Sequence, residues 1–224
     1  MREIVLDTET TGLDPKLGHR IVEIGAVELL NHIPTDNTYH CYINPEREID
    51  QGAFEVHGLS AKFLSNFATF GNIADEFNDF IKDDTLIIHN APFDISFLNA
   101  ELSAIGHKSI NINRIIDTLP MARNKFPGAQ VNLNALCRKY NIDNSHRDLH
   151  GALIDADLLA SVYLELIGGK QPGLKLASNQ KKSDITELIV EKERIKRVFV
   201  ASKAELGAHS ELLDGLTDPV WRIK

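Results

Sequence analysis

The sequence predicts an α/β fold in which helices flank a mixed sheet. Three segments rich in branched apolar residues come first, and short polar connections join them, as is typical of three antiparallel strands. Further strands then alternate with amphipathic helices, which favours parallel strands. The length of 224 residues is sufficient for one domain with a sizeable core and a small C-terminal appendage.

Five short apolar runs are predicted to be strands. The first, residues 2–6, is too short for a globular helix and rich in branched side chains, so we expect a central strand there. The others are expected at residues 20–30, 37–44, 85–89 and 112–116. A polar connection, residues 31–36, separates the second strand from the third.

Helices are predicted between and after the later strands. Residues 50–70 are expected to be irregular, apart from a short helix that begins at Ser60. Pro92 suits the first turn of a helix, Gly106 its end, and Asn132 the start of another. The longer helices are expected at residues 71–81, 92–105, 118–125, 132–140 and 150–167.

The composition divides the chain into three parts. Residues 1–168 form the predicted domain, and residues 169–183 have the composition of a linker. Residues 184–224 form a C-terminal segment with a candidate strand at 197–201 and a candidate helix at 204–213. This segment is too small for a core of its own.

The overall composition is that of a globular protein outside membranes. Hydrophobic residues make up 43% of the chain and charged residues 25%, with no apolar run long enough to span a membrane and no secretion signal. Two cysteines favour a reducing compartment, so we expect a cytoplasmic protein. The net charge of −8 argues against binding nucleic acid by bulk electrostatics, but not against an enzyme that contacts a few nucleotides through metal ions.

Two acids follow the first strand and are separated by one residue, Asp7 and Glu9. Alternate residues of a strand point to the same side, so the two carboxylates are expected to converge. Two like charges so close are costly unless a cation neutralises them, and a hard divalent ion with oxygen ligands fits this need. The alternative is a strand end that passes into a polar turn.

Two further acids, Asp94 and Asp155, lie on the apolar faces of their helices. Apolar residues three and four positions after each acid must face the core, so each carboxylate requires a partner or a metal ion. His150 lies five residues before Asp155, beside the acids at the start of the helix. This position suits a general base, and the alternative is a surface histidine at a helix end.

Three motifs, in this order and spacing, resemble those of the DEDDh exonucleases: Asp7-Thr8-Glu9-Thr10-Thr11-Gly12, His89-Asn90-Ala91-Pro92-Phe93-Asp94 and His150-Gly151-Ala152-Leu153-Ile154-Asp155. Within that family, the chain looks like the epsilon proofreading subunits of bacterial DNA polymerase III over nearly its whole length. Asn132-Leu133-Asn134-Ala135-Leu136-Cys137 and the tail around Trp221 carry this further similarity.

The resemblance implies a ribonuclease-H-like fold and 3′→5′ removal of nucleotides from DNA ends, with nucleoside 5′-monophosphates as products. It implies that Asp7, Glu9, Asp94 and Asp155 bind two Mg²⁺ or Mn²⁺ ions and that His150 takes a proton from the attacking water. The residues that the resemblance places at the substrate are Asp7, Thr8, Glu9, Val56, His57, Phe93 and Asp155.

The resemblance also implies partners. Residues 184–224, including Trp221, would bind the alpha subunit of the polymerase, and Gln171–Leu176 is a candidate sliding-clamp peptide. One alternative is a related exonuclease that acts on RNA 3′ ends or on short oligonucleotides. Another is a non-catalytic scaffold between polymerase and clamp, which the presence of all five site residues disfavours.

Overall fold

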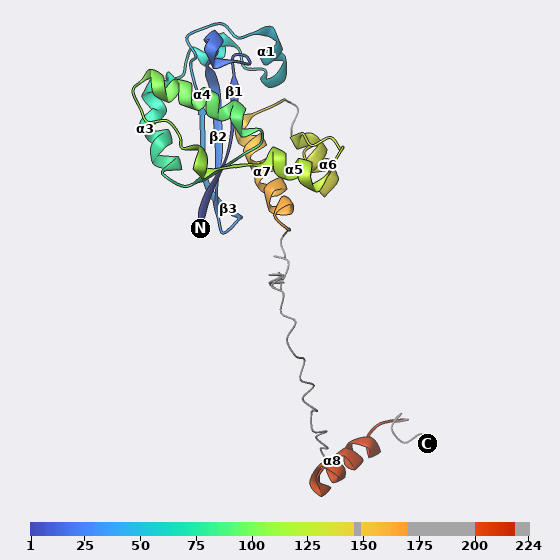
Figure 1. Cartoon of the computed structure of the whole chain (residues 1–224). Helices are drawn as coiled ribbons and strands as arrows, with labels where there is room; N and C mark the ends of the chain where they lie inside the picture. The colour runs from blue at the N-terminus through green and yellow to red at the C-terminus, as the bar shows by residue number, and fades with distance from the viewer. Residues whose placement is uncertain (146–148, 170–199, 218–224) are drawn as a thin grey trace, which may run out of the picture. The chain divides into compact units, whose positions relative to one another are not determined.

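The computed structural model describes residues 1–145, 149–169 and 200–217. The chain divides into two compact units, Met1–Lys175 and Leu176–Lys224 (Figure 1). The candidate clamp peptide Gln171–Leu176 and Trp221 lie outside the described residues, as does most of the linker and of the C-terminal segment. Among the described helices, none is long and apolar enough to cross a membrane.

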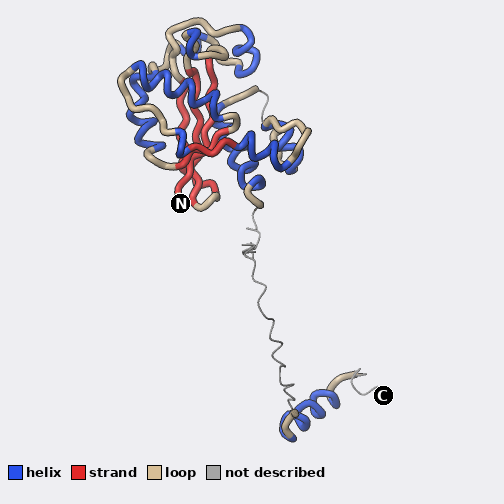
Figure 2. The backbone as a smooth tube through the Cα atoms, in the orientation of Figure 1, coloured by secondary structure: helices blue, strands red, loops and turns tan. Residues whose placement is uncertain are grey.

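A five-stranded mixed sheet forms the centre of the first unit (Figure 2). Its order is β3-β2-β1-β4-β5, with β1 antiparallel to β2, β2 antiparallel to β3, and β4 parallel to both β1 and β5. The sheet confirms the predicted combination of three antiparallel strands with parallel ones. The strands are β1 (Arg2–Thr10), β2 (Ile21–Leu30), β3 (Ile33–Tyr42), β4 (Thr85–Ile88) and β5 (Ile115–Asp117).

The hairpin between β2 and β3 is tighter than the sequence indicated. Its turn is only Asn31-His32, both with positive φ (53° and 68°), so Leu30 pairs directly with Ile33. Positive φ at both central residues is the geometry of a two-residue hairpin turn. The predicted connection 31–36 is therefore wrong, and β3 tolerates Pro34 because it is an edge strand.

Helix α1 (Gln51–His57) was not predicted by the sequence, and it lies within the expected irregular region. Its residues give no apolar stripe, because Phe54 and Val56 are 40% and 43% exposed and only His57 is buried. β5 begins late because Ile112–Arg114 form a 3₁₀ turn. The other helices are α2 (Ala61–Leu64), α3 (Phe70–Ile81), α4 (Ala91–Ala104), α5 (Thr118–Lys125), α6 (Leu133–Tyr140) and α7 (Ala152–Leu166), with a 3₁₀ turn at Pro15–Leu17.

Helices cover both faces of the sheet. One core joins Ile4 and Leu6 of β1 to residues of α3 and α4, such as Phe77 and Phe97. The other core joins Val5 to Leu159 and further residues of α7. Along β1, successive side chains thus alternate between the α4 side and the α7 side, and this alternation positions the residues at the end of the strand.

The described part of the second unit is the helix α8 (Lys203–Asp214), which agrees with the candidate helix at 204–213. Ser202 caps its first turn, and Glu205 completes a capping box. Residues 200 and 201 are not in a strand, and the rest of the candidate strand 197–201 lies outside the described residues.

Candidate active site

The end of β1 presents side chains to both sides of the sheet. Asp7 and Glu9 share a strand face with Val5, which packs toward α7, whereas Thr8 shares a face with Leu6, which packs toward α4. Glu9 and Thr8 are 8% and 5% exposed. The short segment therefore reaches both helices that carry the other candidate acids.

Thr8 holds the carboxylate of Asp94, near the start of α4. The Thr8 backbone N–H and hydroxyl both donate to Asp94 Oδ1, at 3.1 and 2.7 Å. Asp94 is 3% exposed, and burial, opposed by these hydrogen bonds, raises its pKa to about 7. The resemblance placed Thr8 at the substrate, and in the structure its hydroxyl also orients an acid.

A glycine on β2 lets α7 approach the sheet. Gly25 pairs with Asp7 across β1 and β2, and a Cβ at this position would lie 2.1 Å from Leu153 N and 2.2 Å from Ala152 C. Because only a residue without a side chain fits there, the first turn of α7 lies directly on β2. This contact brings Asp155, in that turn, to the end of β1.

His150 lies among the acids, closer than its spacing in the sequence indicated. It precedes α7, and its Nδ1 is 3.2 Å from Asp155 Oδ2. Ligand atoms of Glu9, His150 and Asp155 all lie within 4.8 Å of one another. The His150 N–H donates to the Val56 carbonyl at 3.1 Å, which fixes the backbone of the histidine on the end of α1.

These residues line a pocket of about 400 Å³. Asp94 does not line it and reaches the site through Thr8 from the other face of the sheet. Four polar residues that the sequence had not singled out as site residues contribute to the wall, namely His89, Asn90, Asn132 and Asn134. The full lining is Asp7, Thr8, Glu9, His89, Asn90, Asn132, Leu133, Asn134, His150 and Asp155.

The loop after β1 is tied to its surroundings by polar contacts. Arg20 donates to Glu101 through Nε and Nη2, at 2.6 and 2.7 Å, and Glu101 is 4% exposed. The Thr11 N–H donates to the Arg20 carbonyl at 2.8 Å, and the Arg20 N–H to the Thr11 hydroxyl at 3.0 Å. Since Glu101 lies two turns after Asp94 on α4, this ion pair connects the helix that carries Asp94 to the loop that follows Glu9.

The remaining predicted substrate residues, Val56, His57 and Phe93, do not line this pocket. His57 is 4% exposed, accepts the Leu59 N–H at Nδ1 (3.0 Å) and lies with Nε2 3.3 Å from the Thr10 carbonyl. Burial lowers the pKa of His57, in accord with a neutral ring that supports the strand end. Phe93 is half-buried and packs 5.0 Å from the Phe97 ring.

Comparison with known proteins extends the geometric description. Residues 4–163 match the exonuclease family RNase_T. This exonuclease match begins within β1 and ends within α7. The chain belongs to the exonuclease family.

Curated relatives of this exonuclease match it nearly from end to end. It is 50% identical over 220 residues to DNA polymerase III subunit epsilon of Rickettsia typhi, covering 96% of each chain. It is 43% identical over 224 residues to the protein of that name from Escherichia coli, covering 95% of this chain and 92% of the other. The match places it among the DNA polymerase III epsilon subunits.

The fold also matches solved exonuclease structures. The nuclease domain of 3′hExo, a DEDDh family member bound to rAMP, aligns with a TM-score of 0.61 at 19% identity, over 74% of this chain and 91% of that one. At this identity the likeness concerns the fold, and it agrees with the expected ribonuclease-H-like architecture.

Proposed function

We propose that this exonuclease proofreads DNA synthesis as a subunit of the replicative polymerase, by removing nucleotides from the 3′ end of DNA. The observation that carries the proposal is the pocket at the end of β1, where Asp7, Glu9, Asp155 and His150 meet and Thr8 holds Asp94 alongside. A scaffold has no need of such a cluster, because gathering like charges costs stability.

The donor set fits divalent metal ions. Carboxylate oxygens are the ligands that Mg²⁺ and Mn²⁺ prefer, and the ligand atoms of Glu9, His150 and Asp155 already lie within 4.8 Å of one another. Asp7, Glu9, Asp94 and Asp155 would hold two such ions, with His150 as the base. When bound, two ions stabilise the charge that develops on the attacking and leaving oxygens of a phosphodiester.

His150 would accept the proton of the attacking water. With Nδ1 directed at Asp155, the ring presents Nε2 for the proton, and Asp155 stabilises the imidazolium that forms. The water oxygen forms a bond to phosphorus, and the bond from phosphorus to the 3′ oxygen of the preceding nucleotide breaks. The leaving oxygen takes a proton from solvent, and the product is a nucleoside 5′-monophosphate.

Substrate contacts are assigned by position. Asp7, Thr8, Glu9 and Asp155 line the pocket and would lie along the terminal nucleotide. Val56 and Phe93 would bound the sugar and base from the α1 and α4 sides, and His57 would act through the strand end that it supports. Asn90 and Asn134 join this set as pocket-lining residues.

The C-terminal parts would provide the partner sites. Residues 1–168 would be the exonuclease domain, 169–183 a linker with the clamp peptide Gln171–Leu176, and 184–224 the segment that binds the alpha subunit through Trp221. The printed name of the relatives, DNA polymerase III subunit epsilon, supports association with the polymerase. A cytoplasmic location follows from a role in bacterial replication.

The function is tested with single-stranded DNA and RNA oligonucleotides of the same sequence, in Mg²⁺, Mn²⁺ or EDTA. We expect metal-dependent release of 5′-monophosphates from the DNA 3′ end, slower release from RNA, and none in EDTA. A strong preference for RNA would contradict the proposal and favour RNA-end processing. A truncation after Lys170 should keep this activity and lose polymerase binding.

A further inference from the structure

A lobe beside the catalytic pocket has a charge opposite to that of the whole chain. Residues 118–142 contain four cationic residues and no Asp or Glu, although the chain has a net charge of −8. They form α5 and α6, which pack with α7 around a small core. We call residues 118–142 the basic lobe; its cationic residues are Arg123, Lys125, Arg138 and Lys139.

The basic lobe forms part of the wall of the catalytic pocket. Asn132, Leu133 and Asn134, at the start of α6, line the pocket together with the acids. Arg138 lies one helical turn after Asn134, on the same face of α6. Arg138 and Lys139 also line a separate open hollow of about 340 Å³. The polar wall of the pocket therefore continues along α6 to a cationic surface.

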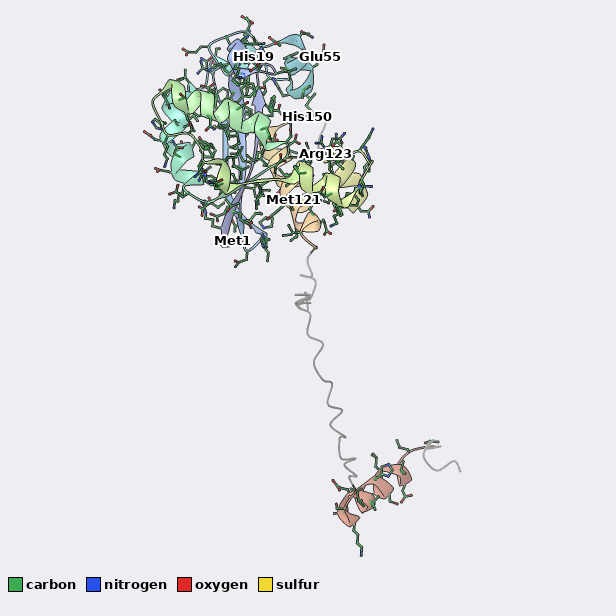
Figure 3. The ribbon with its side chains drawn as sticks, in the orientation of Figure 1. Met1, His19, Glu55, Met121, Arg123 and His150 are labelled. Atoms are coloured by element: carbon green, nitrogen blue, oxygen red, sulfur yellow. The ribbon has the colours of Figure 1, made fainter. Side chains whose placement is uncertain are left out.

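Arg123 brings positive charge to the pocket from α5. Figure 3 shows it on the same side of the domain as His150 in this view. The start of α5 lies at the pocket, because the Thr118 hydroxyl is 2.8 Å from Nδ1 of the pocket-lining His89. The positive charge of Arg123, farther along α5, adds to the burial that lowers the pKa of His89. Arg123 and Arg138 thus come from the two helices whose first residues lie at the pocket.

The four cations differ in what they contact. Lys125 Nζ donates to the Glu165 carbonyl at 2.7 Å, which caps the end of α7, and Lys139 Nζ lies 4.6 Å from the centre of the Phe126 ring. Arg123 and Arg138 are exposed, and within the described ranges neither has a side-chain hydrogen bond or ion pair. The two lysines therefore stabilise the lobe, and the two arginines are available to a ligand.

The carboxylates of the pocket repel the phosphates of a DNA strand, and these arginines can offset that repulsion. Four site carboxylates lie at or beside it, and a DNA strand carries one negative charge per nucleotide. Bound metal ions neutralise charge at the scissile phosphate only, so the preceding phosphates need cations of the protein. The planar guanidinium matches phosphate oxygens with two parallel hydrogen bonds.

We propose that Arg123 and Arg138 bind backbone phosphates of the DNA strand, on the nucleotides that precede the one being removed. The inference rests on the proposed function, because it names the surface over which the substrate of that site runs. Its partner is single-stranded DNA rather than an acidic protein, since Arg138 lies one turn from the pocket-lining Asn134 on the same face of α6.

The test compares two substrates in the full chain with its metal ions. A short oligo(dT) has phosphates beyond the scissile one, whereas the p-nitrophenyl ester of thymidine 5′-monophosphate has none. We expect Arg123→Gln with Arg138→Gln to raise the KM for oligo(dT) about tenfold at low salt and to reduce its salt slope by about 1–1.5. Hydrolysis of the ester should change by less than about twofold, because the chemistry is intact.

The matched control is Lys108→Gln, which removes an exposed cation beyond the far end of α4 and should leave both substrates unaffected. An unchanged KM for oligo(dT) in the Arg123→Gln and Arg138→Gln double variant would overturn the inference. An equal loss on the ester would also overturn it. A parent protein inactive on both substrates would instead overturn the proposed function.

Discussion

Asp94 allows a prediction in which a loss of activity is accompanied by a gain in stability. The pKa of this buried acid is raised from 3.8 to about 7 in the protein without metal. In Asp94→Asn, the amide oxygen still accepts both hydrogen bonds from Thr8, and no charge is buried. At pH 8 the parent protein bears the cost of the ionised carboxylate, and the variant does not.

The size of the expected stability gain follows from the pKa shift of Asp94. Three pKa units at about 1.36 kcal/mol each give a ceiling of about 4 kcal/mol, and we expect about 1–4 kcal/mol of added stability in EDTA at pH 8. The folded state holds the Asp94 proton more tightly than the unfolded state does, so the stability of the parent falls as the pH rises from about 4 to about 7. The advantage of the variant should therefore vanish near pH 4.

Urea unfolding at pH 4 and pH 8, in EDTA and in Mn²⁺, measures this effect. Mn²⁺ should stabilise the parent more than the variant, because it neutralises the carboxylate that the variant lacks. The control is Asp14→Asn, at an acid that accepts the Lys16 N–H and caps the 3₁₀ turn at Pro15–Leu17, where we expect no gain. A variant no more stable than the parent at pH 8 in EDTA would refute the reasoning.

Three further substitutions test the construction of the site. His150→Ala should lower kcat by about 10²–10⁴. Thermal stability should change little, since the His150 side chain is 45% exposed. A kcat within twofold of the parent value would remove His150 from the mechanism. Glu101→Gln should cost about 1–3 kcal/mol in urea unfolding and lower kcat, because Arg20 loses its charged partner; unchanged activity would contradict a positioning role. Gly25→Ala should cost about 1–3 kcal/mol and reduce activity, because the new methyl group displaces the first turn of α7; a stable, active variant would contradict the tight contact.

The sequence was sufficient for the sheet and for most of the helices, because hydrophobic periodicity reflects which side chains are buried. It was also sufficient to single out Asp94 and Asp155. Each is an acid on an apolar helix face, and each is 3% exposed in the structure, among neighbours that are themselves buried. An acid at such a position is informative because its burial is costly.

Helix α1 and the turn between β2 and β3 could not be predicted, because the sequence patterns that would indicate them are weak. Helix α1 buries only His57 and therefore lacks an apolar stripe. The turn between β2 and β3 places His32 at positive φ, and histidine at this position is not part of the usual Asn-Gly or Asp-Gly signal. Residues that depend on such local geometry were placed only by the structure.

Contacts between elements that are far apart in the chain also could not be predicted from the sequence. Thr8 and Asp94 meet across 86 positions, and neither residue indicates the other in isolation. Asn132 and Asn134 line the catalytic pocket only because of the way α6 packs beside α7. Asn132 had a local signal as the residue that starts a helix, but its position at the pocket had none.

The central claim is that the carboxylates at the end of β1 bind the metal ions that nucleotide release requires. The most direct measurement is Mn²⁺ binding by calorimetry together with release of 5′-monophosphates from oligo(dT), for the parent and for Asp7→Ala with Glu9→Ala. We predict that the double variant stays folded and keeps polymerase binding but loses both metal binding and nucleotide release. Unchanged release by the folded double variant would contradict the account.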